Sequence, residues 1–216
     1  MKKEFDFYEF TGIILPGMIV LLFLAVTHPT VNKWLSAEKL GLGEFGVLIL
    51  LSYITGHLIQ GFSNAWEWVF WKLQGGMPTD QLRNKKQTVI SAAQLALVEA
   101  KVPIFLKTSI PEGVAGFPAD AWKGLTRQMY AAVQAAGRNA RIDTFNGNYG
   151  MMRGTVTAGL ITGFFTIGMG IQPEVRILCW IACGTALACY RTRRYGLLYA
   201  RELFAQFIQL DEPSAA

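Results

Sequence analysis

Charged residues are scarce in this sequence, and their scarcity excludes an ordinary soluble domain. Only 16% of the 216 residues are Asp, Glu, Lys or Arg, whereas soluble domains carry roughly 25%. Hydrophobic residues make up 52% of the chain, and they are bunched into runs instead of being spread at amphipathic spacing. Apolar runs of about 18 or more residues are typical of transmembrane helices. The composition therefore predicts an integral membrane protein.

Histidine is almost absent, which narrows the chemistry open to the chain. His28 and His57 are the two histidines, and the lack of any later one excludes His-dependent catalysis, such as an Arg…His ribonuclease site, in the central part. The sequence also has no P-loop, no Gly-x-Ser-x-Gly elbow, no Gly-x-Gly-x-x-Gly fingerprint and no His-Glu-x-x-His motif. We therefore expect a protein that is not an enzyme and that holds no cofactor and no metal.

The few cysteines lie together, in one apolar run near the C-terminus. Cys179 and Cys183 are four residues apart, so in an intact helix they are too constrained to pair with each other. Neither they nor Cys189 have a histidine or an acidic residue nearby. We interpret all three as small, polarizable packing residues in lipid.

Four apolar segments are present, at about residues 10–27, 45–62, 155–171 and 175–190. Each approaches the about 20 residues that a helix needs to cross a bilayer, and isolated spans must be helical because backbone groups in lipid have to bond internally. Only Gln172-Pro173-Glu174 separates the last two. The prediction is an all-α, polytopic membrane protein with two transmembrane hairpins, in residues 1–71 and 154–190. Pro16-Gly17 predicts a kink in the first span.

Two polar parts remain, a cytoplasmic helical insert at residues 72–153 and a tail at 191–216. Thr79-Asp80 predicts the start of an insert helix that ends near Lys101, and a second helix is expected from Ala119 to Ala136. The insert alone has too little core to be an independent domain. We expect it to lean on the membrane, the tail or a neighbouring subunit. The tail has apolar residues at helical spacing, which predicts an amphipathic helix, either interfacial or packed on the insert.

The basic residues predict the orientation. If both termini are cytoplasmic, then all of the 20 Lys and Arg residues except Lys33, Lys39 and Arg176 face the cytoplasm, as the positive-inside rule requires. Aromatic residues lie close together at the cytoplasmic end of the second span, as an interfacial belt would: Trp66, Trp68 and Trp71. We therefore predict a multi-pass protein of the bacterial inner membrane.

One face of the second span is polar. Residues at intervals of four, four, three and four positions form a polar stripe on this face: Ser52, Gly56, Gln60, Ser63 and Glu67. His57 lies beside the stripe. Polar groups inside a membrane usually face other helices or water. One interpretation is a pore lining, a ligand-contacting groove or a proton-sensitive His57. The other is a set of interhelical hydrogen bonds, worth about 1 kcal/mol each, that lock the bundle.

The third span is rich in small residues. Gly159-x-x-x-Gly163 has a close-packing spacing. It fits tight packing between the two helices of the second hairpin. The small residues and threonines of this span also fit a contact in a homo-oligomer or a Thr-lined pathway. If the span forms a contact between copies, replacing both glycines with leucine should break the assembly.

The insert carries a set of basic residues that are candidates for binding a partner: Arg83, Lys85, Lys86, Arg138 and Arg141. Cytoplasmic loops must be basic to satisfy topology, and anionic lipid head groups attract them. We therefore favour a cytoplasmic protein partner, in addition to membrane lipids, over direct binding of nucleic acid.

Two stretches carry a resemblance, Asp6–Gly17 (DFYEFTGIILPG) and Arg141–Arg153 (RIDTFNGNYGMMR). They resemble small bacterial four-span membrane proteins that include accessory or effector proteins of anti-phage and CRISPR defence systems. The resemblance implies a membrane effector or regulator that oligomerises, and it transfers no catalytic residue. The layout of spans, insert and tail is also similar to that of proton-driven stator subunits, but here the insert is short and no intramembrane acid is evident.

The sequence leads to three hypotheses. The first is a non-enzymatic, homo-oligomeric inner-membrane effector that receives a cytoplasmic partner or signal and then changes permeability or recruits that partner. The second is a channel or transporter subunit that acts constitutively on a small solute or ion. The third is a lipid-modifying enzyme that uses His57 and Glu67.

Overall fold

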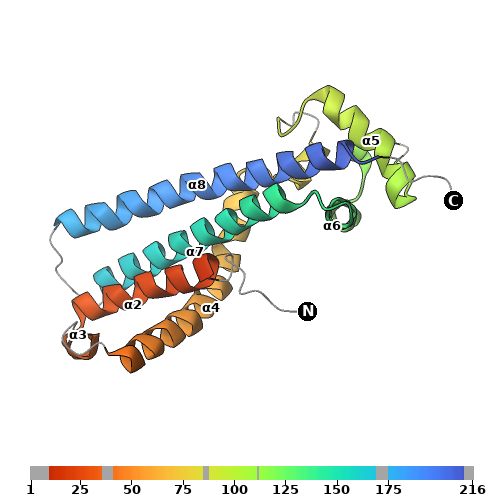
Figure 1. Ribbon diagram of the computed structural model, residues 1–216. Helices are drawn as coiled ribbons and strands as arrows, with labels where there is room; N and C mark the ends of the chain where they lie inside the picture. The colour runs from red at the N-terminus through yellow and green to blue at the C-terminus, as the bar shows by residue number, and fades with distance from the viewer. Residues whose placement is uncertain (1–9, 36–40, 85–87, 111, 169–174, 212–216) are drawn as a thin grey trace. The chain divides into compact units, whose positions relative to one another are not determined.

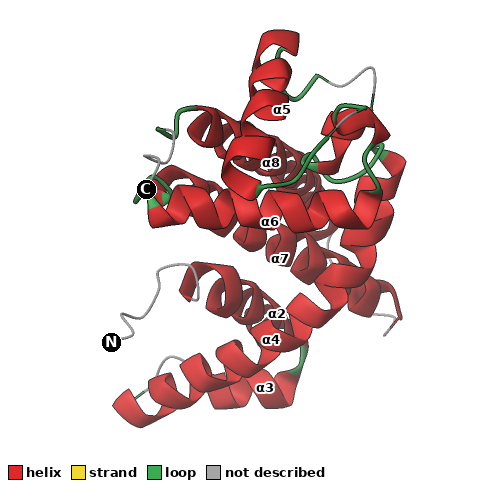
Figure 2. Ribbon diagram, turned by 90° about the vertical axis from the view of Figure 1, so that its right-hand side faces the viewer, coloured by secondary structure: helices red, strands yellow, loops and turns green. Residues whose placement is uncertain are grey.

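The computed structural model describes residues 10–35, 41–84, 88–110, 112–168 and 175–211. These residues form helices and loops, without any strand among them (Figure 2), so the predicted all-α class is confirmed. The long helices are α2 (Leu15–Thr27), α4 (Leu42–Leu73), α5 (Ala92–Leu106), α6 (Ala119–Ala135), α7 (Ala140–Gly168) and α8 (Val175–Ile208). The short ones are the π-helix η1 (Phe10–Ile14), α3 (Pro29–Leu35) and the 3-10 helices η3 (Asp80–Arg83) and η4 (Val114–Gly116).

The chain divides into two compact units. The first unit comprises Met1–Val69 and Gly147–Arg193, and the second comprises Phe70–Asn146 and Arg194–Ala216. Each division falls within a continuous helix, α4, α7 or α8. The fourth apolar segment and the predicted amphipathic tail helix thus belong to one continuous helix, α8. Residues 191–194 contain no glycine or proline that would end α8.

Glycines bring α2 and α4 of the first unit close together. A Cβ added at Gly17 would collide with the backbone oxygen of Ser52, and one at Gly56 would collide with that of Ile13. Only glycine fits at either position, because the opposing atoms are backbone and cannot move aside. Pro16 lies in the first turn of α2, directly after the π-helix, a place where its missing N–H costs little.

Glycines also allow α7 to pack closely on its neighbours in the first unit, where α2, α4 and α7 lie side by side (Figure 1). A Cβ at Gly154 would come within 2.7 Å of the Pro16 ring on α2. One at Gly159 would overlap the Thr185 side chain on α8. Along the sequence, Gly159 and Thr185 lie about equally far from residues 169–174, as two residues that meet in an antiparallel helical hairpin would.

Length and composition single out α4. Among the described residues it is the one helix that is long and apolar enough to cross a membrane, and only 22% of its most apolar stretch is buried. The apolar helix over Thr11–Thr27 is shorter. On this criterion four spans remain a prediction.

The second unit has a conventional apolar core. Trp122 of α6 stacks on Phe204 of α8, with 6.3 Å between ring centroids, and Phe207 meets Phe105 of α5 edge-on at 5.7 Å. Trp122, Phe204 and Phe207 belong to one cluster of sixteen buried apolar residues, and Phe105 packs against it. The end of α8 thus packs on the insert, which decides between the two predicted positions of the tail.

The predicted start of the first insert helix is wrong. Residues Asp80–Arg83 form only a 3-10 turn, and the Thr79 side chain makes no capping hydrogen bond. Helix α5 begins at Ala92, where Ser91 and Gln94 form a reciprocal capping box. The second insert helix was predicted at Ala119–Ala136 and is observed as α6.

Candidate functional site

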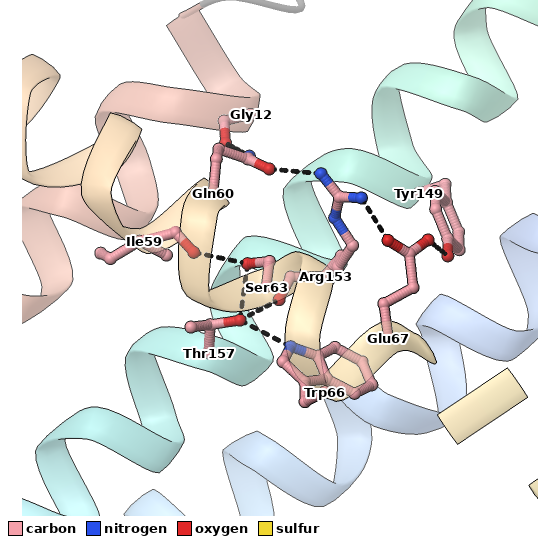
Figure 3. Close-up of polar contacts among 9 residues, drawn as sticks. All are labelled: Gly12, Ile59, Gln60, Ser63, Trp66, Glu67, Tyr149, Arg153 and Thr157. Carbon is pink, nitrogen blue, oxygen red and sulfur yellow. Dashed lines mark hydrogen bonds and ion pairs between the residues drawn. The ribbon is translucent and has the colours of Figure 1, made fainter. Parts of the chain in front are cut away.

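The polar stripe of α4 faces polar residues of α7 in the first unit. The hydroxyl groups of Ser63 and Thr157 lie 2.6 Å apart, and Ser63 also donates to the backbone oxygen of Ile59 at 2.8 Å. The indole N–H of Trp66 donates to the Thr157 hydroxyl at 2.7 Å. We call this contact, together with the ion pair described next, the polar seam (Figure 3).

An ion pair continues the seam by one turn. The Arg153 Nη1 atom lies 2.5 Å from Glu67 Oε2, and Arg153 Nη2 donates to Gln60 Oε1 at 2.5 Å. The Tyr149 hydroxyl donates to the other oxygen of Glu67. Gln60 in turn donates through Nε2 to the Gly12 backbone oxygen at 2.8 Å. Arg153 therefore ties α7 to α4 directly, and through Gln60 it is linked to η1, the π-helix that precedes α2 (Figure 3).

The two charges of the seam are largely removed from solvent. The side chains of Arg153 and Glu67 are 17% and 15% exposed. Burial of a single charge is costly, so each partner makes the other tolerable, and the planar guanidinium can serve two acceptors at once. The Arg153 Nε atom is buried and has no hydrogen-bond partner among the described residues. The pair thus fixes how α4 and α7 align.

The predicted stripe lies on the inner face of α4. Ser52 and Ser63 are fully buried, and the Ser52 hydroxyl donates to the Leu48 backbone oxygen at 2.7 Å. Gly56 is buried against Ile13. Ser52 thus bonds within its own helix, whereas Gln60, Ser63 and Glu67 bond to neighbouring segments of the same chain.

His57 lies outside this arrangement. It is exposed, and its ring meets the Tyr53 ring edge-on with 4.5 Å between centroids. Glu67 is occupied by Arg153 and Tyr149. The structure therefore does not bring His57 and Glu67 together into a catalytic pair.

The two glycines singled out on α7 differ in their surroundings. Gly159 packs on Thr185 within the chain, whereas nothing lies within 4 Å of a Cβ placed at Gly163. A leucine at position 159 would disturb the contact between α7 and α8, so the double replacement would not report on assembly alone.

Two of the basic candidates hold the second unit together. Arg83 donates to the Phe117 backbone oxygen at 2.6 Å, and Arg138 donates to that of Gln209 at 2.7 Å. The Arg141 side chain is 73% exposed and lies 3.5 Å from Glu202, so of the three candidates that the structure describes it is the one most open to a partner. Lys85 and Lys86 lie outside the described residues.

Sequence reasoning missed the α7 half of the seam. Tyr149, Arg153 and Thr157 recur every four residues, which places them on one helical face. Arg153 entered the prediction only as one of the basic residues that indicate the orientation. Matching their spacing to the α4 stripe in the antiparallel direction would have paired Glu67 with Arg153 and Ser63 with Thr157.

The seam is built to connect helices. Its one acid is already paired, and no group of three or more His, Cys, Asp or Glu residues in the described part of the chain could hold a metal ion. The chain matches no family model, and no curated protein or solved structure is similar to it.

Proposed function

We propose that the first unit is a four-span bundle in a bacterial inner membrane. The observation that carries the proposal is the reversed polarity of this unit. Almost every large apolar side chain that is exposed in the described residues belongs to it, the exceptions being Leu73, Met77, Leu97 and Ile104. Exposed apolar patches of this extent are typical of surfaces that face lipid or a partner.

Each of the three helices other than α4 contributes to that surface. Val26 of α2 is 75% exposed, Phe164 of α7 is 75% exposed and Trp180 of α8 is 78% exposed. Helix α2 is apolar but short. The hydropathy of α7 and α8 is lowered locally, because α7 has many inward-facing Gly and Thr residues and α8 continues into an arginine cluster. These features support three further spans.

The interior of the unit suits a lipid solvent as well. Buried threonines bond back to their own helix, Thr166 to the Thr162 backbone oxygen at 2.7 Å and Thr192 to that of Ala188 at 2.8 Å. These hydroxyl groups are thus satisfied inside the bundle, as a membrane interior demands. The distribution of Lys and Arg supports cytoplasmic termini.

Within this topology, the protein serves as a non-enzymatic, homo-oligomeric effector that presents its second unit to a cytoplasmic protein partner. The second unit has its own apolar core and an outward Arg141, which supports docking there. The seam residues bond to one another within one chain, which favours recruitment over a pore lined by the α4 stripe. The setting that we propose, a bacterial defence system, depends on the sequence resemblance alone.

The test compares permeability with recruitment. Purified full-length protein in liposomes should release no trapped dye, with or without a Ser52→Leu/Gln60→Leu double substitution. In cells, a photo-crosslinker at position 141 should capture one cytoplasmic protein, and a crosslinker at exposed Arg127 of α6 serves as the matched control. Dye release by the wild type that the double substitution abolishes would support the channel hypothesis and contradict ours.

A further inference from the structure

The lipid-facing surface of α4 in the first unit consists of two different strips. One is wholly apolar, and its exposed residues are Val47, Ile54, Leu58, Phe62, Ala65 and Val69. The other, which we call the outer strip, is exposed too but mixes small, polar and aromatic residues: Gly46, Leu50, Tyr53, His57, Gly61, Asn64 and Trp68. Both strips lie away from the polar seam, on the same helix and in the same span.

The outer strip holds hydrogen-bonding groups that lipid cannot satisfy. Tyr53 and His57 lie near the middle of the predicted span at 45–62. They touch each other only through their rings, and among the described residues neither they nor Asn64 have a hydrogen-bond partner. Polar groups left unpaired in hydrocarbon are unfavourable, so in transmembrane helices they face protein or water. The apolar strip next to them needs no such cover.

Its spacing also suits a second helix. The residues follow at intervals of four, three, four, four, three and four, so each recurs after eleven positions. An eleven-residue repeat stays on one face of a straight or right-handed helix pair, and right-handed pairs in membranes pack through small residues. Nothing lies within 4 Å of a Cβ placed at Gly46 or Gly61, so both offer room for close approach.

The chemistry of the strip selects its occupant. Copies of one chain insert in the same orientation, so in a two-fold dimer each residue faces its own counterpart at the same depth. Neutral histidine, asparagine and tyrosine each carry both a donor and an acceptor, and each can therefore pair with itself. A strip of lysines or glutamates would repel its copy, and this strip has neither.

We propose that the outer strip of α4 is the surface through which two copies of this chain associate in the membrane. The inference rests on the proposed membrane topology, and it specifies where the proposed homo-oligomer forms. It moves the contact from Gly159-x-x-x-Gly163 of α7 to α4.

Disulfide cross-linking of the full chain in native membranes tests the proposal. In a Cys179→Ala/Cys183→Ala/Cys189→Ala background, Leu50→Cys on the outer strip is compared with Leu58→Cys on the apolar strip. The two leucines are 57% and 64% exposed, so they are matched in residue type and accessibility. A membrane-permeant oxidant should convert most of the Leu50→Cys protein to dimer and leave Leu58→Cys monomeric. Equal cross-linking at both positions, or none at Leu50→Cys, would overturn the proposal.

Disruption provides the second arm. The His57→Phe/Asn64→Leu double variant should weaken dimerisation about tenfold, as measured by single-molecule photobleaching, since two interhelical hydrogen bonds of this kind are worth about 1.4 kcal/mol together. Gly61→Leu should also weaken it, whereas Gly184→Leu, at an equally open position on α8, should not. Unchanged dimers in both outer-strip variants would contradict the proposal.

Carbonate extraction of the same membranes separates the two levels of the account. If the protein is released, the proposed topology is wrong. If it stays in the membrane but remains monomeric, only the α4 dimer is wrong.

Discussion

The two units of this chain differ in where their apolar side chains lie. The second unit buries them in a core, and the first unit exposes most of them on its surface. In the second unit, sixteen buried apolar residues form one cluster that includes Trp122, Met129 and Phe204. Among the described residues of the first unit, the corresponding buried cluster contains only Val20, Ile59 and Ala158, while serine, threonine and an ion pair occupy much of the interior. If the first unit resides in lipid, as we propose, the difference teaches that burial has to be judged against the solvent, because in lipid an exposed leucine costs nothing and polar contacts hold helices together.

The ion pair of the polar seam should give the largest single-site effect. Arg153→Met leaves Glu67 buried without its partner, and Glu67→Gln does the same to Arg153, so each should cost about 3–5 kcal/mol of unfolding free energy. The Arg153→Met/Glu67→Gln double variant should recover much of that loss. Unfolding in mixed detergent micelles measures it, and Lys123→Met, at the exposed pair with Asp120, should have no measurable effect. Equal losses in single and double variants would contradict the account.

A lysine introduced at an exposed leucine should affect the first unit much more than the second. Leu58→Lys puts a lysine near mid-span on the surface that we assign to lipid, and it should disfavour membrane insertion by about 2.5–3.5 kcal/mol. Leu97→Lys, at a 49% exposed leucine of the second unit, should change stability by at most about 0.5 kcal/mol. Insertion is scored by glycosylation mapping. Normal insertion of Leu58→Lys would argue against lipid contact at this position.

Two glycines should respond to alanine with opposite signs. Gly56→Ala pushes a methyl group into the Ile13 backbone, and overpacking of this kind costs about 1–3 kcal/mol. Gly163→Ala meets open space, so the better helix propensity of alanine should stabilise the chain by about 0.5–1 kcal/mol. Thermal unfolding in detergent compares the two. A Gly56→Ala variant as stable as wild type would mean that α2 and α4 do not cross as closely as described.

The smallest predicted effect is a pH dependence in the second unit. Burial and a 2.6 Å hydrogen bond to Asp143 raise the pKa of Tyr130 to about 12, from an ordinary value near 10. The folded state therefore holds the phenol proton more tightly, which stabilises it below about pH 10, and this stability is lost as the pH rises towards 12. Tyr130→Phe should flatten the alkaline decline in unfolding temperature between pH 9 and 12. An unchanged decline would exclude Tyr130 as its source.

The sequence predicted those parts of the fold that depend on local pattern. Apolar runs, the α6 boundaries and the polar face of α4 follow from composition and periodicity. The start of α5 was misplaced because Thr79-Asp80 is an acceptable cap, whereas the capping box at Ser91 and Gln94 is the one that forms. The continuity of α8 was missed because its apolar and amphipathic parts differ in composition, while no helix breaker separates them in the sequence.

Only the α4 half of the candidate site could be predicted from the sequence. The α4 stripe was visible as a periodic set, but which helix faces it is a long-range fact, and Arg153 lies 86 positions from Glu67. Positively charged residues at the ends of spans are expected from the positive-inside rule, so the position of Arg153 had an explanation that did not require an ion pair with Glu67. The exposure of His57 was equally hidden, because its neighbours in sequence lie on both the inner and the outer faces of α4.

The central claim is that the first unit resides in lipid and the second in water. Spin labels at Phe164→Cys and Leu97→Cys, in the cysteine-free full chain reconstituted into bilayers, test it most directly. The account predicts that the label at position 164 collides with dissolved oxygen and is shielded from a water-soluble nickel complex, and that the label at 97 shows the reverse. A label at 164 as accessible to nickel as that at 97 would contradict it, because α7 would then be a helix in water.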